Sequence, residues 1–145
     1  MSLFALLSVS ASGMAAQRSR AETLVENLAN AETTRTPEGG PYRRKDVVFE
    51  SRPTVSAFSS VFQETLGPHV QGVGVRETVI DQREPEKRYL PGHPDADAGG
   101  YVAFPRINPA EDMVDLMSAS RGFQANVSAM TAIKEMIQRS LDLLR

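Results

Sequence analysis

Residues 108–144 read NPAEDMVDLMSASRGFQANVSAMTAIKEMIQRSLDLL, and this stretch decides the fold. Apolar residues recur in it in alternating steps of three and four, the spacing of a coiled-coil seam rather than of a wide helix face. Asn108 supplies an N-cap and Pro109 suits the first helical position. The pattern predicts one helix over 108–145, roughly 50 Å long at about 1.5 Å per residue. The predicted seam residues here are Met113, Leu116, Phe123, Val127, Met130, Ile137 and Leu141.

The N-terminal part, residues 1–36, repeats this spacing and predicts a second helix from about Ser8 to Ala31. Its predicted seam residues include Leu24 and Leu28, and small residues near Gly13 favour close approach of another helix. We expect the two terminal helices to pair as a coiled coil. The C-terminal pattern is the longer one, so a single two-helix contact would leave part of its seam for other subunits.

The middle of the chain, residues 37–107, is rich in turn-forming residues. All nine Pro and eight of the ten Gly lie between Pro37 and Pro109. Short strands are predicted at 46–50, 73–79 and 100–104, with Glu77 interrupting the apolar face of the second. A short helical turn is predicted within 57–66. The fold class is therefore mainly α with a small β insertion, and 1–36, 37–107 and 108–145 form one composite domain.

Composition excludes several classes of protein. A net charge of -2 argues against a protein built to coat nucleic acid, and the absence of Cys removes disulfides and thiolate chemistry. No apolar stretch approaches the roughly 20 residues that a membrane span needs. The N-terminus lacks the basic region of a secretory signal, so any export is expected to use no cleaved leader.

Two clusters of polar residues suggest chemistry, and each has a simpler interpretation. His93 with Asp95 and Asp97 resembles a metal site, but the segment has the composition of a surface turn in which Asp caps backbone amides. The basic run at 43–45 suggests a nucleic-acid patch, yet an intersubunit or envelope-polymer contact fits an acidic chain better. No Ser/His/Asp spacing marks a nucleophile. We therefore predict no catalytic residue, no metal site and no cofactor.

The most specific motif is Asn27-Leu-Ala-Asn30, followed by Thr33-Thr-Arg-Thr-Pro-Glu-Gly-Gly-Pro-Tyr-Arg-Arg44. It resembles the box of the flagellar axial proteins, the family of rod, hook and hook-associated subunits, and its continuation resembles the proximal-rod members. The blocks at 93–102 and 111–127 agree with that family. The motif residues are Asn27, Ala29, Asn30, Thr33, Pro37, Gly39, Gly40 and Tyr42.

The resemblance implies a structural subunit of the proximal rod in the periplasm, not an enzyme. Such subunits are exported without a cleaved signal by the flagellar type III apparatus. They polymerise through their terminal helices into a helical shaft that transmits torque, beside other rod subunits and the adaptor at the base of the rod. Two alternatives stay open from the residues alone. These are a helical adaptor or chaperone of the export system and a small metal-dependent enzyme around His93.

Overall fold

The computed structural model describes residues 3–53 and 71–143. The helical turn predicted within 57–66 lies outside these residues. Within the described residues, two helices and two small antiparallel sheets confirm a mainly α fold with a β insertion. In chain order the elements are α1 (Leu3–Ala29), β1 (Lys45–Pro53), β2 (Gln71–Ile80), β3 (Glu86–Tyr89), β4 (Tyr101–Phe104) and α3 (Pro109–Asp142).

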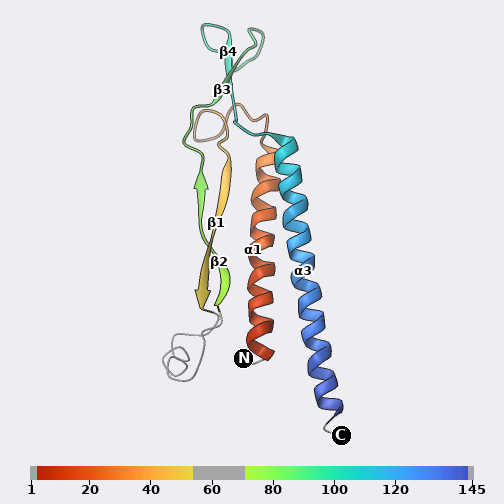
Figure 1. The fold of residues 1–145 in the computed structure, drawn as a ribbon. Coiled ribbons are helices and arrows are strands. Elements are labelled where there is room, and N and C mark those ends of the chain that lie inside the picture. Colours follow the sequence, from red (N-terminus) through yellow and green to blue (C-terminus); the bar gives the residue numbers. More distant parts are fainter. Residues whose placement is uncertain (1–2, 54–70, 144–145) are drawn as a thin grey trace.

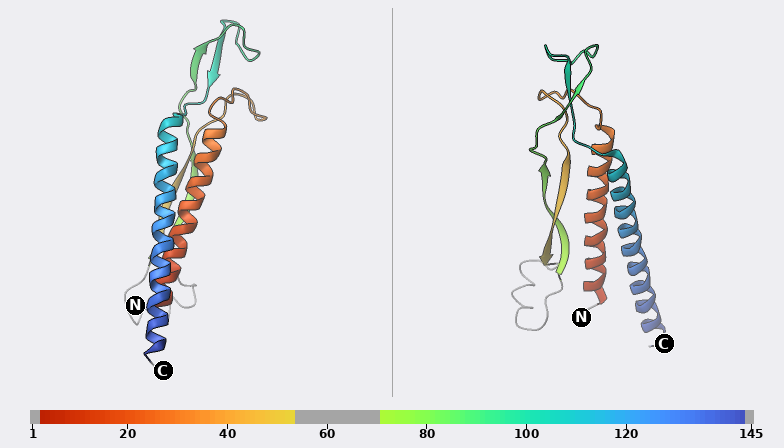
Figure 2. Two further views of the ribbon diagram at one scale, coloured as in Figure 1. Left: turned by 90° about the vertical axis from the view of Figure 1, so that its right-hand side faces the viewer. Right: turned by 45° about the horizontal axis from the view of Figure 1, so that its top comes forward.

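The molecule is elongated, with α1 between two partners (Figure 1). Helix α3 runs antiparallel along one side of α1, and the β1–β2 hairpin lies along another side and contacts it through both strands. The β3–β4 hairpin projects beyond the end at which α1 finishes and α3 begins, as both views of Figure 2 show. No helix among the described residues is long and apolar enough to cross a membrane.

Helix α3 begins as the sequence predicts. The Asn108 side chain accepts a hydrogen bond from the Ala110 amide at 3.2 Å, and Pro109 occupies the first turn. The helix has 34 residues against 27 in α1, which confirms that the C-terminal helix is the longer one. The predicted start of α1 at Ser8 is wrong, because its hydroxyl donates back to Ala5 O at 2.8 Å within a helix that has already begun.

The three predicted strands are present as β1, β2 and β4, and β3 was not predicted because Glu-Lys-Arg-Tyr lacks an apolar alternation. A bulge in β2 explains Glu77. Val48 pairs with Glu77 and Phe49 with Val75, so Arg76 is an extra residue in the ladder. Cross-strand partners share a face. Glu77 therefore points to the face opposite Val73 and Val75 and does not interrupt the apolar face that these two residues share.

The two helices approach most closely at two glycines. A Cβ on Gly13 would lie 2.7 Å from Asn126 Oδ1, and a Cβ on Gly122 would lie 3.1 Å from Gln17 Cδ. The side chain of Asn126 on α3 thus packs over Gly13 of α1, and the side chain of Gln17 on α1 packs over Gly122 of α3. This reciprocal arrangement fixes the axial register of α1 against α3, and it fits the expectation of close approach near Gly13.

The apolar stripe that the sequence predicts overlaps only in part with the face of α3 that packs on α1. The buried residues of α3 are Asp112, Ala119 and Ile133. Of the predicted seam, Leu24 is buried; Leu28, Leu116, Met130 and Ile137 are half-buried; and Met113, Phe123, Val127 and Leu141 are exposed. The exposed part of the stripe lies beside the intramolecular contact, where small and polar residues take many of the inner positions.

Candidate functional site

The box residue Asn27 joins α1 to the start of β1. Its side chain is fully buried. Asn27 Nδ2 donates to Lys45 O at 2.8 Å, and its Oδ1 accepts from the Lys45 amide at 2.9 Å and from Tyr42 Oη at 3.0 Å. A carboxamide has both the donor and the acceptor that pairing with a strand residue requires, whereas a carboxylate lacks the donor. The Asn27 side chain therefore pairs with both backbone groups of Lys45, as a residue of a neighbouring strand would.

Tyr42 closes this contact from the loop side. It is buried, and burial together with the negative charge of Glu26 raises its pKa to about 12. The phenol therefore stays a neutral hydrogen-bond donor throughout the physiological range. The Tyr42 amide also donates to Thr33 O at 3.0 Å, which folds the loop back onto the end of α1.

The second Asn of the box has a more local role. Asn30 Nδ2 donates to Glu26 O at 2.9 Å and its Oδ1 accepts from Thr33 Oγ1 at 3.2 Å, which closes the helix exit. Gly39 and Gly40 have φ of 92° and 78°, a region that favours glycine, and they form a turn with Thr36. The structure thus places Asn27 and Ala29 at the end of α1 and the other motif residues in the segment that follows it, where Pro37 lies within the Thr36–Gly40 turn; Ala29 and Pro37 are exposed.

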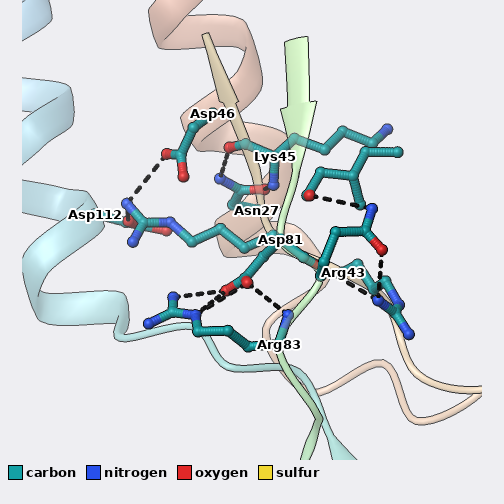
Figure 3. A network of polar contacts seen from close by, with 10 residues as sticks. Asn27, Arg43, Lys45, Asp46, Asp81, Arg83 and Asp112 are labelled. Atoms are coloured by element: carbon teal, nitrogen blue, oxygen red, sulfur yellow. Dashed lines mark hydrogen bonds and ion pairs between the residues drawn. The ribbon is translucent and has the colours of Figure 1, made fainter.

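An ion pair ties this junction to α3. Arg44 Nη2 lies 2.9 Å from Asp112 Oδ1 and 3.5 Å from Asp46 Oδ1, and Asp112 is fully buried. Figure 3 shows Asn27 of α1, Asp46 of β1 and Asp112 of α3 meeting here. Burial raises the pKa of Asp112, and the positive charge of Arg44 opposes that rise. Three elements that are distant in sequence are therefore held at one point.

The basic side chains at 43–45 are engaged in contacts within the chain. Arg43 Nη1 donates to Asp81 O at 3.3 Å, Arg44 pairs with Asp112, and Lys45 Nζ pairs with Glu26. Beside them, hydrogen bonds from the side chain and the backbone amide of Arg83 lower the pKa of Asp81 to about 2 (Figure 3). These contacts leave less positive charge for an external polyanion.

The loop between β3 and β4 contains His93, Asp95 and Asp97. The carboxylate of Asp95 accepts a hydrogen bond from Thr34 Oγ1 at 2.8 Å, which joins this loop to the segment that follows the Asn27–Asn30 box. Asp97 Oδ1 accepts from the amides of Gly99 and Tyr101 at 2.8 and 2.9 Å. Both carboxylates thus have partners within the chain, and the described residues hold no cluster of three or more potential metal ligands.

The outward side of α3 is the remaining feature. Exposed apolar residues there are Met113 57%, Val114 61%, Met117 53%, Phe123 38% and Val127 42%. By helical periodicity Met113, Met117, Phe123 and Val127 lie on one side of the helix, beside the face that contacts α1. We call these four residues the outer stripe. An exposed apolar stripe on a long helix is typical of a surface that binds another protein.

Comparison with known proteins gives a consistent family. Residues 98–143 match the family described as "Flagellar basal body rod FlgEFG protein C-terminal". The chain is 38% identical to the flagellar basal-body rod protein FlgC of Borreliella burgdorferi, with 100% of this chain and 99% of that protein covered. It is 40% identical to FlgC of Bacillus subtilis and 38% identical to FlgC of Salmonella typhimurium, with 99% of this chain covered in both. In those two relatives 99% and 98% of the length is covered.

Proposed function

Since this chain belongs to the FlgC family of flagellar basal-body rod proteins and is a structural subunit of that rod, we propose that it joins neighbouring subunits through the outer stripe of α3. The membership confirms the resemblance seen in the Asn27–Asn30 box. The role is structural, and the relatives are named as rod proteins rather than as enzymes.

The observation that carries the proposal is the position of the outer stripe. Met113, Phe123 and Val127 are exposed, although their spacing is that of a buried seam. Apolar residues at seam spacing gain stability only when another helix covers them. Helix α1 covers a different face of α3, so the covering helix comes from another subunit. In this proposal the coiled-coil packing predicted from the sequence forms between subunits.

The finer features of the role are also proposals. We place the subunit in the proximal, periplasmic part of the rod, next to other rod proteins and the adaptor below them, where it transmits torque. It reaches that position through the flagellar type III export apparatus without a cleaved leader. The segments 1–36, 37–107 and 108–145 act together as one composite domain, because the Asn27 and Arg44 contacts connect all three.

The test places a charge in the outer stripe. Val127→Asp puts a carboxylate where another helix is proposed to pack, and an unpaired buried charge costs several kcal/mol. We expect loss of swimming and loss of the subunit from isolated basal bodies. Ala129→Asp is the matched control, because Ala129 is exposed on the same helix two residues after Val127 and, by helical periodicity, lies on the side opposite the outer stripe.

Both variants are first checked for expression, folding by circular dichroism and export. A folded, exported Val127→Asp protein that supports normal swimming would show that the outer stripe is not an assembly surface. Lys87→Asp, in the exposed β3 strand, provides a second control and is expected to leave swimming intact.

A further inference from the structure

One end of the outer side of α3 carries a compact apolar patch. Met113, Val114 and Met117 lie within the first turns of the helix and are 57%, 61% and 53% exposed. We call these three residues the head patch. Met side chains adapt to differently shaped partners, which suits a surface that receives another helix. Among the described residues, no element covers this patch (Figure 1).

The opposite end of α3 extends past its partner helix. The two close contacts, Gly13 with Asn126 and Gln17 with Gly122, set the antiparallel register. Continued along both helices, this register places Leu3, the first described residue of α1, level with Met136. The part of α3 after Met136, which we call the tail, therefore lies beyond the described part of α1, as Figure 1 shows. Within it Leu141 and Leu143 are 60% and 88% exposed.

We propose that the head patch receives the tail of the C-terminal helix of the next subunit along the rod. This inference rests on the proposed function and names the partner of one part of the outer stripe. Head and tail occupy opposite ends of one helix, so a contact between them is heterologous and repeats without closing, as a filament requires. The donor in this contact is a second copy of this chain, because the exposed Leu141 and Leu143 of the tail belong to the same sequence as the head patch.

The helix dipoles favour this pairing. In a staggered parallel contact the C-terminal end of one helix lies beside the N-terminal end of the next, so opposite ends of the two helix dipoles meet. The exposed Glu111 in the first turn and Arg139 in the last turn carry opposite charges, whereas Asp112 is buried against Arg44 and Asp142 adds a negative charge to the tail. The dipole arrangement favours a head-to-tail contact over head-to-head or tail-to-tail contacts.

The proposed contact also fixes the axial offset between successive subunits. The centre of the head patch is near residue 115 and the centre of the tail is near residue 139. At about 1.5 Å per residue these points are roughly 36 Å apart along α3. Successive subunits joined in this way are therefore offset by about 36 Å along the helix direction.

Site-specific photo-crosslinking in assembled basal bodies tests the contact. Met117 is replaced by p-benzoylphenylalanine, basal bodies are isolated and irradiated, and the crosslinked peptides are identified by mass spectrometry. The same residue at Val114 provides a second position, and at Lys87 of β3 it provides a control outside the patch. We expect Met117 and Val114 to capture the last two turns of a C-terminal axial helix, and Lys87 not to capture that segment.

The outcomes separate this inference from the proposed function. Crosslinks from both patch positions to an N-terminal helix, to a hairpin or to no protein, in basal bodies that contain the subunit, would overturn the head-to-tail contact and leave the rod role intact. Absence of the unsubstituted chain from basal bodies would overturn the proposed function and this inference with it. Capture of the C-terminal peptide of this chain supports the contact, and capture of a C-terminal peptide of a different rod subunit alone would overturn it.

Discussion

Replacing Asn27 by Ala should destabilise the subunit more than any other single change in the box. The Asn27 side chain is fully buried and makes three hydrogen bonds, two with the Lys45 backbone and one with Tyr42 Oη. Truncation leaves all three partner groups unsatisfied in a buried place, and each such group costs about 1–3 kcal/mol. Because two of the bonds share Oδ1 and water can enter the space, we expect a total loss of about 3–5 kcal/mol.

Asn30→Ala is the matched control. It is the same substitution in the same box, but the hydrogen bonds of Asn30 to Glu26 O and from Thr33 Oγ1 are local. Asn30 is also half-buried, so water can replace these contacts. We expect a loss of about 1 kcal/mol or less. Tyr42→Phe, which removes one donor from Asn27 Oδ1, should lie between the two.

The assay is equilibrium urea unfolding of the full chain, followed by the helical circular dichroism signal. Native domains are stable by only about 5–15 kcal/mol, so the expected loss for Asn27→Ala is a large fraction of the total and shifts the midpoint clearly. Comparable slopes for all variants are required before midpoints are compared. If Asn27→Ala costs no more than Asn30→Ala, the buried amide does not hold β1 to α1, and our account of the box fails.

Three further predictions follow from the packing and charges. Gly13→Val should cost about 1–3 kcal/mol in urea unfolding, since its side chain meets Asn126, and Asn126→Ala should recover part of that loss. The raised pKa of Asp112 means that the folded chain holds this proton more tightly, so its contribution to stability is full below about pH 3.9 and is lost as pH rises through the folded pKa. Asp112→Asn should remove that part of the pH dependence. In hydrogen exchange, amides of α3 beyond Met136 should exchange faster than those at 119–133, because the tail extends past α1. Equal protection of the two segments in a confirmed monomer would show that the tail is covered.

The elements with strong local signals could be predicted from the sequence. Asn108 and Pro109 mark the start of α3 because capping is a local interaction between residues close in the chain. The alternation around Val73 and Val75 predicts β2 for the same reason. The polar strand β3 and the bulge at Arg76 could not be predicted, because both depend on the register of a partner strand that the local sequence does not contain.

The site could be predicted only in part. The box residues Asn27 and Tyr42 were identified through the family resemblance, but their hydrogen bonds to each other and to Lys45 required the fold. The pair of Arg44 with Asp112 was missed. By sequence Asp112 is an ordinary acidic residue of a first helical turn, and only the fold, which brings the Arg44 side chain from just before β1 to α3, gives it a partner.

The displaced seam has a physical cause that links fold and proposed function. Close helix packing within the subunit needs small residues, so Gly13 and Gly122 occupy the inner face. Because glycine has no apolar side chain, the apolar periodicity of the sequence does not reveal this face. Large apolar residues at seam spacing, such as Phe123 and Val127, fall beside that face and stay exposed. A folded monomer gains little from them there, since exposed apolar side chains contribute stability only when they are covered. In the assembly that we propose, contacts between subunits explain their spacing, and the sequence of α3 then serves two packings at once. The inner face uses glycine and amide side chains for the fold, and in this proposal the outer stripe uses large apolar side chains for assembly.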